Sequence, residues 1–294
     1  MKPNCQNERQ TMTVRPATLR TTPLQAVIFD VDGTLAETEL DGHRVAFNQA
    51  FKEFGLDWNW TPELYGELLA VTGGKERIRL YVETHDVRML DRRDFDVWVA
   101  RLHQRKSALY SERVLSGAIP LRPGVARLIQ ELRAVGIRTA IATTTTPSGL
   151  HSLIMAHFEA DMSSLFEVIG AGDRVAKKKP AADIYHWVLQ QLNLPPEACL
   201  AIEDSYAGLT AARAAGIPTV ITVNAYTADQ DFDGALSVVA DLGEPDAAAR
   251  HLGGLPLTRP CVDLAQLLAW HQEYSAASPE DKRIDSQAVG VSAT

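Results

Sequence analysis

The order of apolar and polar positions along the chain predicts helices that alternate with buried strands. Residues 24–29 form a short apolar run, rich in β-forming residues, that ends at the segment DVDGT and is typical of a buried strand. After residue 120, helical stretches alternate with further short apolar runs. Strands are predicted at residues 137–142, 166–169, 199–202, 219–223 and, as an edge strand, 237–240, and helices at residues 125–136, 148–157, 183–192 and 263–274. This alternation favours an α/β fold built on a doubly wound parallel sheet.

Residues 40–119 carry a helical pattern instead. Apolar side chains recur at helical spacing over residues 43–54, and Thr61-Pro62 is a good N-cap and N1 pair for a second helix. Two more helical stretches follow, at residues 76–83 and 94–115, with no convincing strand between them. We therefore expect an inserted helical module over residues 40–119, with residues 24–39 and 120–275 forming the α/β core.

Composition and charge narrow the classes of protein that this chain can be. Of its 294 residues 46% are hydrophobic, which is ample for a core, and its formal net charge is −8. A chain this acidic lacks the basic footprint of a nucleic-acid binder. It also has no run that approaches the roughly 18–20 apolar residues needed to span a bilayer. We expect a monomer without nucleic-acid or membrane partners, and any anionic substrate would need local positive charge.

The cysteines and the chain ends bear on the compartment. The three cysteines are scattered, without metal-ligand spacing, and fit a reducing, cytoplasmic environment. Residues 1–23 lack an apolar stretch, which excludes a secretory signal, and we expect a disordered leader. The alternatives are a start at Met12 or a transit peptide, which would imply the plastid stroma. The polar residues 276–294 are predicted to be a disordered tail.

Two carboxylates follow the first predicted strand. Asp30 and Asp32, two positions apart, leave the sheet on one side of the chain, and Gly33 frees the backbone to turn. Such a pair can bind a divalent cation. It can also divide the work of phosphoryl transfer, because one carboxylate can attack phosphorus while the other protonates the leaving alkoxide and then activates water. The alternative is a simple strand-ending turn, which Asp and Gly also favour.

Later strand ends carry complementary groups. Residues 143–146 are threonines before a predicted helix, a setting that suits a phosphate oxygen, and residues 177–179 are lysines that can neutralise phosphate charge. Glu203 and Asp204 can complete the oxygen ligands of a hard cation. Each group also has an ordinary interpretation, as an N-cap or a solvated basic patch. Because ligands of open α/β sheets gather at the carboxyl ends of the strands, the set together indicates phosphoryl transfer through an aspartate.

These motifs resemble those of the haloacid dehalogenase superfamily, and they read here FDVDGT, IATT, KKKPAADIY and AIEDSYAGLTAARAAG. The resemblance implies a Rossmann-like core in which Asp30 is the nucleophile and Asp32 the general acid and base. It also implies that Thr143 donates a hydrogen bond to the phosphate and that Lys179, directly before the proline of its motif, stabilises the charge.

The same resemblance implies Mg²⁺ as the cofactor. Its ligands would be Asp30, the backbone carbonyl of Asp32 and Asp204, with Glu203 as a direct or an outer ligand. The helical insertion would correspond to the cap of this superfamily, which closes over the site and excludes water.

Further segments narrow the resemblance. DGHRVAFNQAF, LYGELLAVTGGKERI, LRPGVARLI and YTADQDFDGA are similar to segments of the CbbY proteins. These enzymes hydrolyse xylulose 1,5-bisphosphate, an inhibitor of the Calvin-cycle enzyme Rubisco, to xylulose 5-phosphate. We expect that activity here, with a sugar bisphosphate as the small-molecule partner.

The insertion also offers candidate substrate contacts. Glu39 and His43 lie where they can bind sugar hydroxyls, and Tyr65 is expected to cover the pocket. A glycine-rich segment with two cations suits a second, remote phosphate, and its members are Gly73, Gly74, Lys75, Glu76 and Arg77. On the core side we add Thr144 and Thr145 to the substrate contacts. The alternative for each insertion residue is an ordinary surface position on a helix.

Other functions share parts of this constellation. A β-phosphoglucomutase-like sugar phosphomutase has the same nucleophile, acid/base group and cap, and a phosphoglycolate-type phosphatase differs only in substrate. A receiver domain, from a different class, also uses an acid pair, a hydroxyl and a lysine on a parallel sheet. The second carboxylate, Asp32, and the helical insertion disfavour a receiver, which needs neither.

Overall fold

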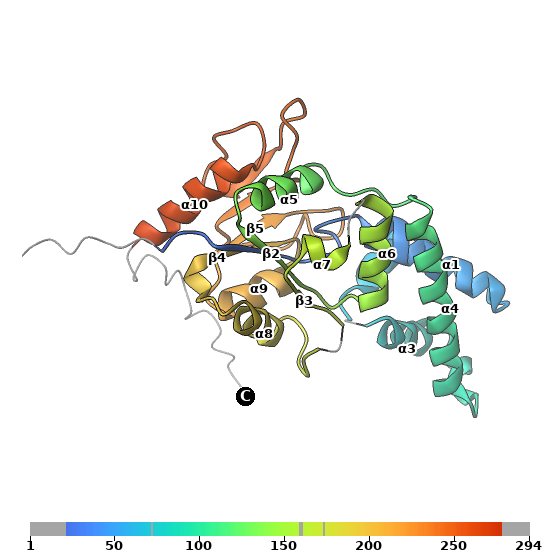
Figure 1. Ribbon diagram of the computed structural model, residues 1–294. Coiled ribbons are helices and arrows are strands. Elements are labelled where there is room, and N and C mark those ends of the chain that lie inside the picture. The colour runs from blue at the N-terminus through green and yellow to red at the C-terminus, as the bar shows by residue number, and fades with distance from the viewer. Residues whose placement is uncertain (1–21, 72, 159–160, 173, 278–294) are drawn as a thin grey trace, which may run out of the picture.

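A computed structural model of the chain describes residues 22–71, 73–158, 161–172 and 174–277 (Figure 1). The predicted leader, residues 1–23, and the predicted tail, residues 276–294, fall almost wholly outside these ranges. Within them, no helix combines the length and the apolar character that crossing a membrane requires.

A seven-stranded sheet forms the centre of the α/β core, in the strand order β3-β2-β1-β4-β5-β6-β7. The first strand, β1 (Ala26–Phe29), pairs in parallel with β2 (Arg138–Ala142) on one side and β4 (Cys199–Glu203) on the other. The remaining parallel strands are β3 (Val168–Gly170), β5 (Thr219–Thr222) and β6 (Ser237–Val239). The predicted α/β fold with a parallel sheet is confirmed.

One strand was not predicted. It is β7 (His251–Gly254), which forms one edge of the sheet and pairs antiparallel with β6. The segment predicted as an edge strand, β6, therefore lies one position inside the sheet. The sequence of β7 is HLGG and most of it is exposed. A strand with two glycines and no buried face lacks the apolar alternation by which strands are recognised.

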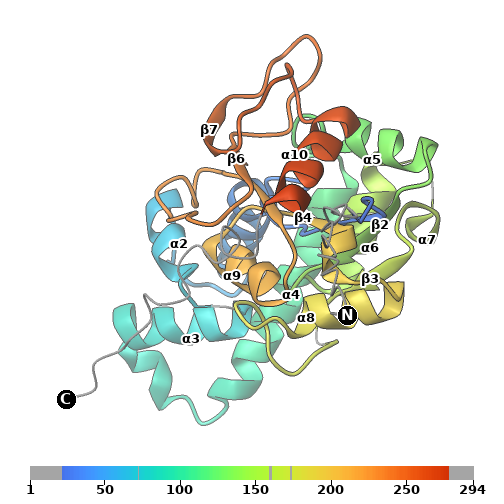
Figure 2. The ribbon, with the colours of Figure 1, turned by 90° about the vertical axis from the view of Figure 1, so that its left-hand side faces the viewer.

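Helices cover both faces of the sheet because β1 alternates its side chains. Val27 and Phe29 belong to an apolar cluster on one face, whereas Ala26 and Ile28 belong to a cluster on the other. Figures 1 and 2 show α5 and α10 on one side of the sheet and α8 and α9 on the other. The core helices are α5 (Val125–Ala134), α6 (Pro147–His157), α7 (Met162–Leu165), α8 (Asp183–Leu192), α9 (Tyr206–Ala214) and α10 (Leu264–Ala276).

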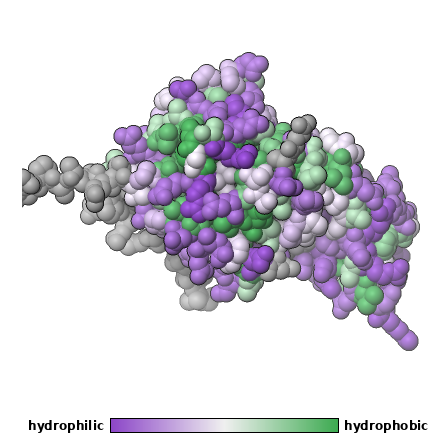
Figure 3. All heavy atoms as spheres, viewed as in Figure 1, coloured by the Kyte–Doolittle hydropathy of each residue, from purple (hydrophilic) through white to green (hydrophobic). Residues whose placement is uncertain are grey.

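Between β1 and the core helix α5, the described part of the chain forms only helices and the loops that join them. This stretch contains a π-helix (Thr38–His43), α1 (Arg44–Glu53), α2 (Pro62–Leu68), α3 (Gly74–His85), a 3₁₀-helix (Val87–Asp91) and α4 (Phe95–Leu115). We call these elements the helical insertion. They share an aromatic cluster of their own, which includes Phe47, Phe51, Trp58, Trp60 and Trp98. The face of the insertion that Figure 3 shows is mostly hydrophilic.

The two chain segments that join the insertion to the core run side by side. Ala36 forms an antiparallel bridge with Leu121, and the Arg122 N–H donates to the Leu35 carbonyl at 2.8 Å. The buried Arg122 guanidinium pairs with Glu37 at 3.1 Å. It also donates to backbone carbonyls at or just beyond the ends of three core strands, those of Gly33, Thr222, Val223 and Ala240. Both connections are thereby fixed beside the carboxyl edge of the sheet.

Candidate active site

A buried lysine joins two carboxylates at the carboxyl end of the central strands. Lys179 Nζ donates to Asp30 Oδ1 at 2.6 Å, to Glu203 Oε1 at 2.5 Å and to the Ala142 carbonyl at 2.7 Å. Burial raises the pKa of Asp30 to about 7, although the charge of Lys179 opposes the shift. Of the three consecutive lysines, the structure therefore brings Lys179 to Asp30.

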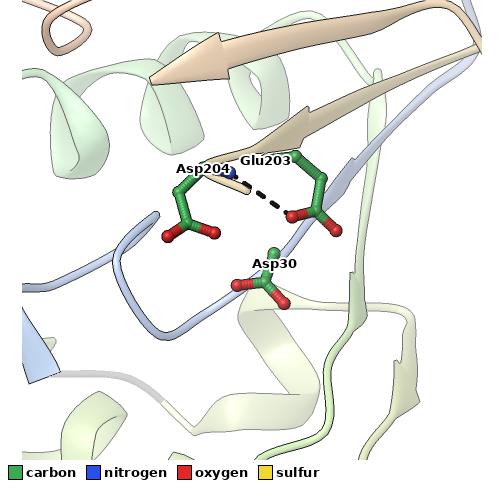
Figure 4. Close-up of side chains that lie close together, drawn as sticks. All are labelled: Asp30, Glu203 and Asp204. Carbon is green, nitrogen blue, oxygen red and sulfur yellow. Dashed lines mark hydrogen bonds between the residues drawn. The ribbon is translucent and has the colours of Figure 1, made fainter. Parts of the chain in front are cut away.

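Asp30, Glu203 and Asp204 form an acidic triad whose ligand oxygens lie within 4.8 Å of one another (Figure 4). Burial also raises the pKa of Asp204 well above its usual value. Lys179 supplies one positive charge against three carboxylates, so two negative charges remain uncompensated when all are ionised. Hard carboxylate oxygens with this excess charge fit a divalent cation such as Mg²⁺.

Two glycines make the triad possible. At Gly33, which has φ +81°, a Cβ would lie 2.3 Å from Asp204 Oδ2, and at Gly208 a Cβ would lie 1.9 Å from Glu203 Oε2. Any side chain at either position would displace a carboxylate. Gly208 lies in the first turn of α9, whose N-cap Ser205 follows directly on Glu203 and Asp204. The strand-to-helix turn thus sets both acids at the sheet edge.

The side chain of Asp32 lies apart from the triad and is held by other groups. Thr38 Oγ1 donates to Oδ1 at 2.5 Å, the Thr145 hydroxyl donates to Oδ2, and His43 Nε2 lies 3.5 Å from Oδ1. Burial would raise the pKa of Asp32, but these neighbours, His43 foremost, hold it below the usual value. Asp32 is therefore ionised and available to exchange a proton.

Several predicted substrate contacts of the insertion bind one another. The Tyr65 hydroxyl donates to Glu39 Oε2, Arg77 Nη1 donates to the Tyr65 hydroxyl at 2.7 Å, and Arg77 lies 3.7 Å from the Glu39 carboxylate. Tyr65 is fully buried, so it supports Glu39 and Arg77 from behind, where we had expected it to cover the pocket. Since Glu39 neutralises Arg77, Lys75, which is exposed, is the freer cation of the glycine-rich segment.

Two cavities meet beside these residues. One, of about 390 Å³, reaches from Asp30 toward the loop after β5, and the other, of about 440 Å³, reaches into the insertion. Lys75, Lys106 and Lys178 line the second cavity. Residues common to both linings are Asp32, Glu39, Gly73, Arg77 and Thr144. His43, Gly74, Glu76 and Thr145 line the second cavity alone.

Thr143 contacts its own turn, and the hydrogen bond to the phosphate that the resemblance implies stays a prediction. It lines neither cavity, and its Oγ1 accepts a hydrogen bond from the Thr145 N–H at 3.1 Å. The neighbouring Thr144 lines both cavities. The hydroxyl of Thr143 thus stabilises the turn after β2, and Thr144 is the threonine that lines both cavities.

Other residues of the site were missed by sequence reasoning. Tyr185 donates to Glu203 Oε1 at 2.5 Å, Asn224 Nδ2 donates to Asp204 Oδ2 at 2.7 Å, and Lys106 Nζ lies 2.8 Å from His43 Nδ1. Tyr185 stands in the motif KKKPAADIY and could have been inferred from it. Lys106 occupies an ordinary helical position, and nothing in its sequence context distinguishes it.

Comparison with known proteins agrees with this geometry. Residues 24–216 match the haloacid dehalogenase-like hydrolase family. Protein CbbY of Cupriavidus necator is 48% identical over 249 residues, which are 84% of this chain and 97% of that protein. Protein CbbY of Rhodobacter capsulatus is 50% identical over 233 residues, or 79% of this chain and 98% of that protein.

A solved structure adds a fold comparison. The crystal structure of a CbbY mutant from Rhodobacter sphaeroides in complex with xylulose 1,5-bisphosphate has a TM-score of 0.69 and 42% identity, and the match covers 76% of this chain and 96% of that one. The motifs, the sheet topology and these relatives agree with the predicted enzyme class, a phosphatase. The chain therefore belongs to the haloacid dehalogenase-like hydrolases.

Proposed function

We propose that the protein is a Mg²⁺-dependent phosphatase that converts xylulose 1,5-bisphosphate to xylulose 5-phosphate through a phosphorylated Asp30. The observation that carries the proposal is the buried contact of Lys179 with Asp30 and Glu203, two members of the acidic triad. A relative with 42% identity has been crystallised with xylulose 1,5-bisphosphate, which supports this substrate.

In the first half of the reaction, an Asp30 carboxylate oxygen attacks phosphorus and the bond from phosphorus to the sugar oxygen breaks. Lys179, by its hydrogen bond to Oδ1, fixes the plane of the carboxylate and offsets part of its charge. Asp32 gives a proton to the departing sugar oxygen. Because Asp32 is ionised in the free enzyme, it takes up that proton when the phosphate dianion arrives, since a nearby negative charge raises its pKa.

In the second half, water attacks the aspartyl phosphate, Asp32 accepts a proton from that water, and inorganic phosphate leaves. Thr38, Thr145 and His43 orient the Asp32 carboxylate for both transfers. Asp30, Asp204 and the Asp32 carbonyl would hold Mg²⁺, with Glu203 as an outer group, and the bound ion would offset the negative charge of the phosphate and the carboxylates.

The preference for a bisphosphate rests on the charges of the second cavity. Lys75, Lys106 and Lys178 place positive charge away from Asp30, in a chain whose net charge is −8. A second phosphate group there would gain charge-assisted contacts, whereas a monophosphate would not. We propose Lys75 as the chief contact, with Gly73 and Gly74 offering their backbone and Glu39 a sugar hydroxyl.

The helical insertion is proposed to act as the cap over this site. It supplies His43, Glu39 and Lys75 and is joined to the core by two adjacent connections, around which it can open and close. Closure would exclude water until the sugar has left.

Measuring inorganic phosphate released from a panel of substrates tests the function. Xylulose 1,5-bisphosphate should release one phosphate and leave xylulose 5-phosphate, and chelation of Mg²⁺ with EDTA should stop the reaction. Isomerisation of a sugar monophosphate without phosphate release would instead establish a mutase. Preference for phosphoglycolate would instead support a phosphoglycolate-type phosphatase. That alternative is included because a phosphoglycolate phosphatase of Rhodospirillum rubrum is 30% identical over 243 residues.

A further inference from the structure

The loop that follows β5 contacts the acidic triad through a single amide side chain. Asn224 Nδ2 donates to Asp204 Oδ2 at 2.7 Å, and Asn224 Oδ1 accepts from the Tyr226 N–H at 2.8 Å. The chemistry of the partners fixes this orientation of the amide. A carboxylate can accept only from the NH₂ group, and a backbone N–H can donate only to the amide oxygen.

The pair formed by Asn224 and Asp204 is packed against the loop that carries the catalytic acids. A Cβ on Gly33, the residue after Asp32, would lie 2.4 Å from Asn224 Nδ2 and 2.3 Å from Asp204 Oδ2. Arg122 holds the two loops together, since it donates to the carbonyls of Gly33 and Val223. Asp204 Oδ2 is thus enclosed by Asn224 and Gly33, and the second oxygen, Oδ1, is left for the metal.

We propose that Asn224 is a positioning residue for the metal site, which holds the Asp204 carboxylate in the rotation that metal binding requires. The inference rests on the proposed function, in which Asp204 is a Mg²⁺ ligand. Groups that hydrogen-bond a metal-binding carboxylate orient it, and their loss typically weakens metal affinity by about 10- to 100-fold.

The competing explanation is that Asn224 only builds its turn. The turn has other support, because the Asn224 N–H donates to Thr227 Oγ1 at 3.0 Å and the Asn224 carbonyl accepts from the Ala228 N–H at 3.1 Å. A serine can also cap such a turn, more weakly, through its hydroxyl. Its side chain is too short to reach Asp204, so Asn224→Ser separates the two roles.

The experiment compares the full-length wild type with Asn224→Ser and with a matched loop control, Thr227→Val. Thr227 is buried, and its hydroxyl contacts the Asn224 backbone and not Asp204. Mg²⁺ binding is measured by isothermal titration calorimetry without substrate, and folding is checked by thermal melting in EDTA. Asn224→Ser should bind Mg²⁺ about tenfold or more weakly, while Thr227→Val should bind close to the wild type.

A kinetic readout adds a second criterion. In Asn224→Ser, kcat should recover as Mg²⁺ is raised, because the lesion is one of metal affinity, and KM for the bisphosphate at saturating Mg²⁺ should stay near the wild-type value. Asn224→Thr, which keeps a hydroxyl acceptor, serves if Asn224→Ser does not fold.

Wild-type Mg²⁺ affinity in a folded Asn224→Ser variant would overturn this inference and leave the proposed function standing. Equal weakening in Asn224→Ser and Thr227→Val would also overturn it, since general loosening of the loop would then be the cause. If the wild type itself bound no Mg²⁺, the proposed cofactor would fall first and the inference with it.

Discussion

Lys106 Nζ lies 2.8 Å from His43 Nδ1, and Nε2 of the same imidazole lies 3.5 Å from Asp32 Oδ1. An ammonium group can only donate hydrogen bonds, so His43 Nδ1 must accept the one from Lys106. The proton of the neutral imidazole is then on Nε2, which faces Asp32. Tyr110 stacks on the imidazole with ring centroids 3.9 Å apart, which fixes its plane. A lysine of the insertion therefore determines which nitrogen of His43 faces Asp32, the proposed acid/base group of the core.

Replacing Lys106 should impair proton transfer. Lys106→Met keeps the buried stem but removes the donor, so His43 can adopt the other tautomer and lose its contact with Asp32. We expect kcat to fall roughly tenfold, a part of the ~10²–10⁴ that general acid–base catalysis contributes. Arg101→Met, an exposed change on the same helix, should leave kcat unchanged. An unchanged kcat in Lys106→Met would remove the proposed role.

The charge of Lys106 should also make substrate binding depend on pH. Burial lowers the pKa of Lys106 to about 8, although Glu39 opposes the shift. The ammonium is therefore present below pH 8 and lost above it, so the cavity becomes less positive as pH rises. We expect KM for the bisphosphate to increase between about pH 7 and 9, and Lys106→Met to lack this increase. Steady-state kinetics at several pH values in that range, all at the same ionic strength, would measure this change in KM.

Substitutions of Asp30 and Asp32 should distinguish the two halves of the proposed reaction. Asp30→Asn should release no phosphate from any substrate, because no nucleophile remains. Asp32→Asn should lower kcat on sugar phosphates by about 10²–10⁴-fold. With p-nitrophenyl phosphate, whose leaving group needs no proton, Asp32→Asn should instead show a burst of one equivalent of nitrophenol per enzyme and then stall. Steady turnover of that substrate by Asp32→Asn would contradict the role assigned to Asp32 in activating water.

The sequence was sufficient for the groups that stand at strand ends. Asp30, Lys179, Glu203 and Asp204 all follow predicted strands or lead into helices, and parallel strands bring their carboxyl ends to one edge. The meeting of Asp30, Glu203 and Asp204 therefore follows from the topology, whereas Lys179 lies in the segment between β3 and α8 and is identified by its motif. The same reasoning located the inserted helices, since apolar side chains at helical spacing need a partner face to bury them.

Other contacts depend on packing that no local pattern records. Lys106 and His43 are separated by 63 positions and meet because α4 packs against the π-helix that ends at His43 and against α1, which follows it. Tyr65 was expected to cover the pocket, but its ring is buried in the aromatic cluster of the insertion. Asn224 resembles any turn-forming asparagine, and its bond to Asp204 exists because Gly33 lets the two loops approach closely.

The proposed remote phosphate contact can be tested by comparing substrates. Lys75 is exposed and lines the second cavity, away from Asp30. Lys75→Ala should raise KM for xylulose 1,5-bisphosphate several-fold. A charge-assisted hydrogen bond contributes about 1.5–3 kcal/mol, and solvent screening reduces that contribution for an exposed lysine. It should change KM for a monophosphate much less. Lys52→Ala, an exposed lysine on α1, provides the control. Equal losses for both substrates would place Lys75 outside the second phosphate site.

Arg122 and Glu37 should contribute unequally to stability, although they form one ion pair. The Arg122 side chain is 6% exposed and donates to several backbone carbonyls, whereas the Glu37 side chain is 33% exposed. Arg122→Met would leave those buried carbonyls without a donor, at about 1–3 kcal/mol each before relaxation. We expect it to lower the free energy of unfolding by about 3 kcal/mol or more.

Glu37→Gln, by contrast, keeps a side chain of the same shape and removes only a partly solvated charge, so its loss should stay near 1 kcal/mol. Urea unfolding at pH 7 measures both variants. If the ion pair were the main contribution of Arg122, the two substitutions would cost about the same. A much larger loss in Arg122→Met than in Glu37→Gln would show that the guanidinium acts mainly by binding the carbonyls at the strand ends. Two of those carbonyls, of Gly33 and Val223, lie directly after Asp32 and directly before Asn224, so the same variant should also weaken Mg²⁺ binding.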